Sequence, residues 1–265
     1  MTRTAISPRL AIRIFCSTDD NVGAVSTPDV PRPADVPDDG SVEWPEGWLV
    51  REVVETGSTN ADLLARAESA ADRTVLRADH QIAGRGRLNR FWEAPAGANL
   101  LCSILFRTVP ADPGELTRRV GLAVVDAAHT LAGVHASLKW PNDVLVDGGK
   151  LAGILAQRAP NGVVVVGVGV NLGWAPEGAA RLAGIGPQAM LAGVLRAFDA
   201  LPVDVSLRYR ERLGTLGQRV RIERPAGDLV GTAIDVDGEG RLVVLDECAI
   251  SHRIDVGDVT HLRPA

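Results

Sequence analysis

Cysteines and long apolar runs are both scarce in this 265-residue chain. The three cysteines, Cys16, Cys102 and Cys248, are scattered and show no C-x-x-C spacing. An odd number at irregular spacing argues against a disulfide framework and favours small buried thiols in a reducing compartment. No apolar run approaches a membrane span, and the only candidate signal segment, residues 10–16, is short and interrupted by an arginine. We therefore expect a cytoplasmic protein.

Lysine is the scarcest of the common charged residues. The net charge of −5 argues against a protein that binds nucleic acid or membrane surfaces as a whole. Only two of the 28 basic residues are lysines, Lys139 and Lys150. A lysine ammonium is a compact charge on a slim stem, which suits a narrow pocket better than the broad arginine fork. The alternative is that the two lysines reflect evolutionary drift in an arginine-rich sequence and have no chemical role.

The chain divides into three regions by composition. Residues 1–45 are rich in proline, aspartate and serine, so we expect a flexible tail that is too small for a helix-turn-helix module. Residues 46–213 carry helix-period and strand-period patterns, whereas residues 214–265 contain four or five short strands, which is typical of a small β-barrel. In the middle region we expect strands at 49–55, 74–78, 99–106, 144–146, 150–157 and 163–170. We expect one helix to follow residue 59, a second to begin at residue 112 and a third to span residues 189–198.

A polar turn, Gly57-Ser58-Thr59-Asn60, joins the first strand to the first helix. Ser58 or Thr59 can cap the helix, and the cap alone explains one hydroxyl group. Two hydroxyls and an amide in a row also form a small polar cup. Helix capping and ligand contact therefore both remain open for this turn.

The segment from His80 to Trp92 contains three arginines, Arg85, Arg87 and Arg90, two of them separated by glycines. Glycine lets the backbone approach a ligand, and arginine forms bidentate bonds with phosphate or carboxylate. The pattern favours an anion-binding loop over a solvated surface turn. It matches neither a P-loop nor a dinucleotide-binding fingerprint. Trp92 can stack on a base or pack over the loop.

Lys150 follows a hairpin signal, Asp147-Gly148-Gly149, at the start of an apolar run. Its side-chain stem is therefore expected to lie along buried neighbours. The next β-branched run contains Gly167 and Gly169 and ends at Asn171. Glycines inside a strand indicate either close approach by a ligand or backbone, or a buried edge or bulge.

Five motifs in order carry a family resemblance. They are G-S-T-N at 57–60, Q-I-A-G-R-G-R at 81–87, K-W-P-N-D at 139–143, G-K-L-A-G-I-L at 149–155 and G-V-G-V-N at 167–171. Over roughly residues 47–265 the chain resembles biotin protein ligases of the short class that lacks an N-terminal DNA-binding domain. The resemblance implies an α+β fold: a central mixed sheet flanked by helices, of the class II synthetase-like biotin–lipoate ligase type, with a small SH3-like C-terminal β-barrel. The implied domains are 46–213 and 214–265.

The resemblance also implies a two-step reaction. Biotin and ATP would form biotinyl-5′-AMP and pyrophosphate, and a lysine of a biotin carboxyl carrier domain would then take the biotin and release AMP. Mg²⁺ would screen the triphosphate with few or no protein ligands. The implied partners are biotin, ATP and the carrier domain of a biotin-dependent carboxylase. Neither nucleic acid nor membrane is expected, and a homodimer is possible for this family.

Twelve residues receive roles from the resemblance. Those around biotin would be Ser58, Thr59, Gln81, Arg85 and Gly153. The catalytic residues would be Lys150, between biotin's carboxylate and the α-phosphate, and Arg87. Those around the nucleotide would be Arg87, Arg90, Trp92, Asn142, Asp143, Lys150 and Asn171.

One motif departs from the family pattern, and three rival functions remain. After G-R-G-R the family often continues with a basic residue and a glycine, whereas this chain has Leu88 and Asn89. The rivals are a lipoate or octanoate ligase or transferase of the same fold, a regulator that binds biotinyl-AMP, and a biotin storage protein. Lipoate and octanoate enzymes lack this form of the arginine run. A regulator that binds biotinyl-AMP would need a winged-helix domain, for which residues 1–45 are too small. A biotin storage protein would not need cations directed at phosphate.

Overall fold

The computed structural model describes residues 42–224, 227–255 and 257–262. The predicted tail falls almost entirely outside the described residues, as does Cys16. None of the described helices is both long and apolar enough to cross a membrane. Of the other cysteines, Cys102 is buried as predicted, but Cys248 is exposed, so the prediction of buried thiols is wrong for Cys248.

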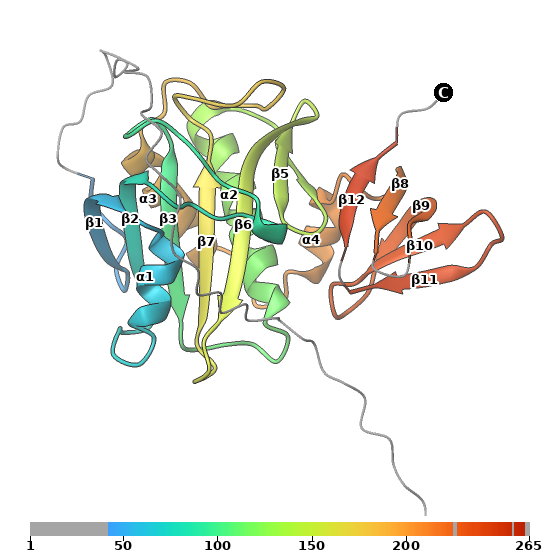
Figure 1. The fold of residues 1–265 in the computed structure, drawn as a ribbon, viewed down its shortest axis with the longest axis horizontal. Helices are drawn as coiled ribbons and strands as arrows, with labels where there is room; N and C mark the ends of the chain where they lie inside the picture. The colour runs from blue at the N-terminus through green and yellow to red at the C-terminus, as the bar shows by residue number, and fades with distance from the viewer. Residues whose placement is uncertain (1–41, 225–226, 256, 263–265) are drawn as a thin grey trace, which may run out of the picture. The chain divides into compact units, whose positions relative to one another are not determined.

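A seven-stranded mixed sheet forms the centre of the fold (Figure 1). Only β1 and β2 pair in parallel, and every other neighbouring pair is antiparallel. The three-residue strand β4 is too short to give a pattern and was not predicted from the sequence. In spatial order the strands are β1 (Leu49–Thr56), β2 (Thr74–Gln81), β3 (Leu100–Phe106), β7 (Val164–Val170), β6 (Gly149–Arg158), β5 (Asp143–Val146) and β4 (Ser137–Lys139).

Helices cover both faces of this sheet, which confirms the predicted α+β class (Figure 1). The short helix α1 (Thr59–Ala65) packs on one face, against β3 and β7. On the other face, α2 (Gly114–Ala132) packs against the sheet and against α3 (Pro187–Asp199). A fourth helix, α4 (Ser206–Arg212), contacts α2 and β4.

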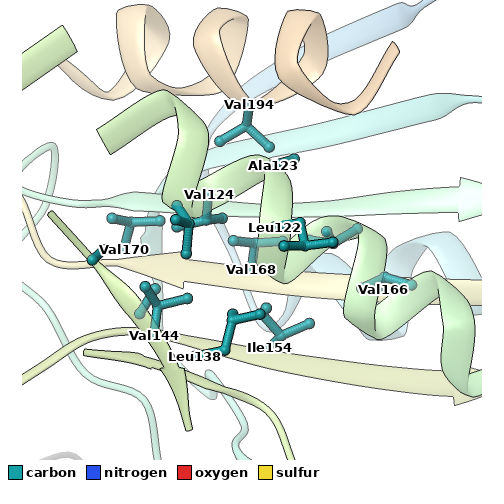
Figure 2. Packing of buried hydrophobic residues seen from close by; sticks show 14 of the residues in the cluster. Leu122, Ala123, Val124, Leu138, Val144, Ile154, Val166, Val168, Val170 and Val194 are labelled. Atoms are coloured by element: carbon teal, nitrogen blue, oxygen red, sulfur yellow. The ribbon is translucent and has the colours of Figure 1, made fainter. Parts of the chain in front are cut away.

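The α2 face holds the main apolar core (Figure 2). Alternate valines of β7, Val166, Val168 and Val170, lie beneath Leu122 and Val124 of α2. This alternation follows from the pleat of a strand, in which successive side chains point to opposite faces. The β-branched run therefore fills one face with bulky side chains, and the residues between them determine the character of the other face.

A five-stranded antiparallel sheet forms the C-terminal part of the chain. Its spatial order is β11 (Ser251–Ile254), β10 (Leu242–Asp246), β9 (Leu229–Val236), β8 (Arg219–Glu223) and β12 (Asp258–His261). The strands agree with the prediction, but the closed barrel does not. β11 and β12 are the two edges and, within the described residues, do not pair with each other. Each is only four residues long, too short to wrap around and close the sheet.

The two sheets share contacts and one apolar core. Trp140, which precedes β5, donates its indole Nε1–H to the Gly240 carbonyl at 3.0 Å and its backbone N–H to the Thr215 hydroxyl at 3.0 Å. Buried residues of the five-stranded sheet, such as Ile222 and Val244, belong to the same apolar cluster as α2 and β7. The predicted domain boundary between residues 213 and 214 stays a prediction.

Candidate active site

A cavity of about 270 Å³ opens on the α1 face of the seven-stranded sheet. The sequence motifs that supply its walls extend from residue 57 to residue 171, and the fold brings them together. Every site residue predicted from the sequence lines this cavity: Ser58, Thr59, Gln81, Arg85, Arg87, Arg90, Trp92, Asn142, Asp143, Lys150, Gly153 and Asn171. Asp258 of β12 also lines it and was not predicted.

Glycines create the space for the cavity. From Val163, just before β7, the alternate residues that face α1 are first two valines, Val163 and Val165, and then two glycines, Gly167 and Gly169. Gly169 pairs in register with Gly153 of β6, so the sheet presents a flat patch without side chains. We call Gly153, Gly167 and Gly169 the glycine floor. A Cβ at Gly153 would lie 2.9 Å from the Trp92 ring, and one at Gly169 would overlap the same indole. Side chains, Trp92 and Asn60, approach these glycines closely, and the predicted approach of a ligand stays a prediction.

A β-bulge directs Lys150 into the cavity. In a regular strand Lys150 and Gly153, three residues apart, would point to opposite faces. The register between β5 and β6 shifts at this place, and the consecutive residues Leu151 and Ala152 both enter the α2-side core. The shift returns Lys150 to the face of the glycine floor, where a Cβ on Gly153 would lie 3.2 Å from the lysine Nζ. Bulges commonly re-aim a side chain next to functional sites.

The Lys150 ammonium lies between a carboxylate and an aromatic ring. Its Nζ is 2.7 Å from Asp143 Oδ1 and 5.5 Å from the centroid of the Trp92 ring. The side chain remains 40% exposed, so the ammonium is available to a ligand in the cavity. Asp143 keeps the ammonium in place in the ligand-free protein, and an anionic ligand can share or replace this contact.

Beside the floor, on the same face of the sheet, lies a largely buried network of polar side chains. The Thr59 hydroxyl bonds Gln81 Oε1 at 3.0 Å and the Ser103 hydroxyl at 2.7 Å. Ser103 in turn donates to Asn60 Oδ1 at 2.6 Å. Ser58 is the N-cap residue of α1 but makes no side-chain cap bond, so the capping reading of its hydroxyl is wrong. These hydroxyl and amide groups form the polar end of the cavity.

The arginine segment is a β-hairpin rather than an open loop. Trp92 N–H donates to the Gly84 carbonyl at 3.0 Å, and Gly86 N–H donates to the Arg90 carbonyl at 2.7 Å. Arg85 and Phe91 form a bridge between these two pairs. We call residues 84–92 the arginine hairpin. The indole of Trp92 lies on the glycine floor, and its Nε1 is buried without a hydrogen-bond partner among the described residues.

The three arginines of the hairpin have different surroundings. Arg87 is the most buried, which lowers the pKa of its guanidinium against the opposing influence of Asp258 and Asp143. It donates to Asn142 Oδ1 at 3.2 Å and to the Gly257 carbonyl at 3.1 Å. Arg90 forms an ion pair with Asp258. Arg85 lies exposed at the cavity mouth, so its predicted place beside biotin stays a prediction.

The two asparagines predicted for the nucleotide side are engaged with backbone. Asn142 donates its amide to the Ile154 carbonyl at 2.7 Å, which leaves its Oδ1 for Arg87. Asn171 donates to the carbonyls of Lys150 at 3.0 Å and Ala180 at 3.1 Å. Both amides therefore fix the backbone around Lys150, a role that sequence spacing did not reveal.

The cavity contains no activated nucleophile. Cys102 lines it, but complete burial raises the pKa of this thiol to about 12, so the thiol stays protonated at neutral pH. The described residues also contain no group of three His, Cys, Asp or Glu side chains that could hold a metal ion. The walls instead offer cations, hydroxyls and a flat apolar floor. Such a site can orient and neutralise anions.

Two family models match most of the region that the structure describes. The Biotin/lipoate A/B protein ligase family matches residues 50–173, and the biotin protein ligase C-terminal domain matches residues 215–261. The biotin–acetyl-CoA-carboxylase ligase of Mycobacterium tuberculosis is 44% identical over 243 residues, which cover 82% of this chain and 91% of that protein. The chain belongs to the biotin protein ligase family.

Solved structures of the ligase family share the fold. A biotin protein ligase from Aquifex aeolicus in complex with biotin and ATP matches with a TM-score of 0.71 and 25% identity, covering 82% of this chain and 99% of that one. A ligase from Leishmania major in complex with biotinyl-5-AMP matches with a TM-score of 0.57 and 18% identity, covering 78% and 99%. The second likeness concerns the fold alone.

Three residues of the cavity, Asn60, Ser103 and Asp258, received no assigned role from the sequence. Asn60 donates its amide to the Leu155 carbonyl at 3.1 Å and to Gln157 Oε1 at 2.8 Å, and thereby ties α1 to β6. Ser103 lies in the middle of a buried strand, where a lone serine gives no pattern. Asp258 lies far along the chain in the five-stranded sheet. The only available signal was that Asn60 stands beside the two hydroxyls of the polar turn.

Proposed function

We propose that this protein uses ATP to join biotin to a lysine of a carrier domain, by way of biotinyl-5′-AMP. The observation that carries the proposal is the convergence of two cations from separate segments on one cavity. Lys150 of β6 binds Asp143, and Arg87 of the arginine hairpin binds the adjacent Asn142. Two anions, a carboxylate and a phosphate, can meet only where such cations reduce their mutual repulsion.

The buried polar end of the cavity suits the head group of biotin. A ureido ring both donates and accepts hydrogen bonds, and hydroxyl and amide side chains do the same. Ser58, Thr59 and Gln81 supply these groups within the network that includes Ser103. Arg85 adds a donor at the mouth. Gly153 and the rest of the glycine floor give the aliphatic chain of biotin a flat apolar surface, once the Trp92 indole has moved aside to make room.

The other end of the cavity suits the nucleotide. Arg87 and Arg90 face the phosphates, Trp92 offers a ring for the adenine, and Asn142 and Asn171 hold the backbone that carries Lys150 and Asp143. Lys150 lies between the two ends. A charge at this position can contact biotin's carboxylate and the α-phosphate together, which orients the two groups for reaction.

The first step then needs no proton transfer by the protein. A carboxylate oxygen of biotin attacks the α-phosphorus of ATP, and the bond to the β-phosphate oxygen breaks with release of pyrophosphate. Lys150 and Arg87 stabilise the negative charge that collects on the phosphate oxygens. In the second step the carrier's neutral lysine amine attacks the acyl carbon of the mixed anhydride, the bond from this carbon to the phosphate oxygen breaks with release of AMP, and the amine proton passes to the solvent. The hairpin covers the cavity and limits hydrolysis of the anhydride by water.

Mg²⁺ fits this site only as a companion of ATP. Three carboxylates line the cavity: Asp143 and Asp258, each paired with a basic side chain, and the exposed Glu93. A metal ion entering here would take its ligands mainly from phosphate oxygens and water, as Mg²⁺ commonly does. Its chemistry would be to screen the triphosphate, and the protein's own cations would act on the α-phosphate. The carrier domain, by analogy with the named relatives, would belong to a biotin-dependent carboxylase.

The direct test combines two assays on the purified chain. Incubation with biotin, ATP, Mg²⁺ and a carrier domain should add the mass of one biotin to one carrier lysine. Biotin should also stimulate exchange of labelled pyrophosphate into ATP without the carrier. Octanoate and lipoate serve as competing acids, since a ligase for either would share the fold. A well-folded protein that catalyses exchange with octanoate or lipoate but not with biotin would overturn the proposal.

A further inference from the structure

The five-stranded sheet reaches the arginine hairpin through the start of β12. The Gly257 carbonyl accepts a bond from Arg87 at 3.1 Å, and the Asp258 carboxylate pairs with Arg90. Asp258 also lines the cavity, although the proposed reaction gives it no part. A carboxylate beside a phosphate site would repel the ligand unless a nearby cation neutralises it. Here Arg90 of the hairpin is that cation.

Asp258 is held more firmly than the arginine it binds. Its backbone pairs with Glu223 of β8, and the next residue, Val259, is buried in the common core. Gly257 lies so close to Ile222 that a Cβ would fall 2.6 Å from that side chain, so the backbone here is tightly packed. The carboxylate is therefore presented from a fixed strand.

The arginine hairpin has few other restraints of its own. Leu88 at its tip is 65% exposed and Phe91 is 75% exposed, so the hairpin gains little from apolar burial on its outer side. Its inner attachments are the Trp92 indole and the guanidinium groups of Arg87 and Arg90. Loss of one ionic attachment should therefore raise the fraction of time that the hairpin is open.

We propose that Asp258 is a positioning residue that acts through Arg90 to hold the arginine hairpin over the cavity. The five-stranded sheet thereby contributes to the affinity for ATP and to the retention of the reactive adenylate. This role rests on the proposed function. Because Arg90 is largely exposed, water screens the ion pair and the expected effect is modest.

The experiment compares Asp258→Ala with the wild type and with Asp255→Ala. Asp255 is a matched control because it precedes the same strand, is exposed, and does not line the cavity. In Asp258→Ala, trypsin should cleave the ligand-free protein after the hairpin arginines about threefold faster. The KM for ATP and the rate of adenylate release should rise by a similar factor, with kcat almost unchanged. Asp258→Glu, which keeps the charge, should restore most of the loss.

A double-mutant cycle decides whether Asp258 acts through Arg90. If it does, Asp258→Ala should add nothing to the tryptic cleavage rate or the KM in an Arg90→Ala background. Equal effects in both backgrounds, or wild-type behaviour of Asp258→Ala, would overturn the proposal. Tryptic cleavage needs no activity. A wild type without biotin-dependent exchange would therefore count against the ligase function alone, while the cleavage rates would still test the contact between Asp258 and the hairpin.

Discussion

The two walls of the cavity are built in contrasting ways. The sheet wall consists of the glycine floor and the buried network of Thr59, Gln81 and Ser103, whose bonds are made by groups with little exposure to water. The opposite wall is the arginine hairpin, held by the Trp92 indole, by two hydrogen bonds of Arg87 and by the exposed ion pair of Arg90. Buried hydrogen bonds are costly to break, whereas exposed ion pairs are weak and depend on salt.

This difference indicates that the two walls serve different steps of ligand binding. The sheet wall is in place before any ligand arrives and can select the acid by shape and hydrogen bonding. The hairpin wall can open to admit ATP and close over the intermediate. Mutations in the sheet wall should therefore change biotin affinity and stability together. Mutations in the hairpin wall should change nucleotide kinetics without changing stability.

The largest effect is expected at Lys150, where the two walls meet. Lys150→Ala should lower biotin-dependent pyrophosphate exchange by about 10²–10³-fold, the range for loss of one group that stabilises developing charge. Lys150→Arg should not restore the rate, because the broad guanidinium cannot take the place of the compact ammonium. Stability should change little, since the side chain is partly exposed. An arginine variant with wild-type exchange would contradict this assignment.

The glycine floor is the next most sensitive feature. Gly169→Ala should destabilise the protein by about 1–3 kcal/mol, because the new methyl group overlaps the Trp92 indole and forces repacking. Biotin affinity should fall in the same variant. Gly238→Ala is the matched control, since a Cβ there meets no atom within 4 Å and its φ is not positive. Urea unfolding and biotin titration measure both quantities, and equal effects of the two substitutions would refute a special role for the floor.

The buried network should respond to loss of a single amide. Asn60→Ala should cost about 1–2 kcal/mol of unfolding free energy, because it removes the hydrogen bonds that the buried amide makes with Ser103, Leu155 and Gln157. Asn161→Ala, which removes two hydrogen bonds made by an exposed side chain, should cost less. Chemical denaturation of both variants provides the comparison. If the two losses are equal, the network is not the rigid part of the site.

The smallest expected effect is a pH dependence at the contact between the sheets. Burial and the nearby Lys139 lower the pKa of His261, which lies 3.2 Å from the Thr215 hydroxyl, below its ordinary value of 6.5. As the pH falls below about 6.5, the unfolded chain takes up a proton that the folded protein resists, so stability falls. Unfolding free energies at pH 5.5 and 7.5 should differ less in His261→Gln than in the wild type. The same difference in both proteins would contradict the assignment.

The five motifs, through the family resemblance that they carry, predicted twelve residues that line the cavity, but not Asn60, Ser103 or Asp258. Glycines in a β-branched run, a lysine after a tight turn and arginines between glycines each carry a local signal. The sequence did not reveal that Lys150 shares a face with Gly153, because a β-bulge depends on the register between two strands. Nor did it reveal the contact between Arg90 and Asp258, because that contact depends on how the five-stranded sheet packs on the rest of the described chain.

The central claim is that cations from two separate segments act on one phosphate. Titration calorimetry with a non-hydrolysable biotinyl-adenylate analogue tests it directly, using Lys150→Ala, Arg87→Ala and the double variant. We predict non-additive losses of affinity, with a coupling energy in the range of about 0.5–3 kcal/mol that groups sharing one partner show. Strictly additive losses, or no loss in either single variant, would show that Lys150 and Arg87 do not share a ligand.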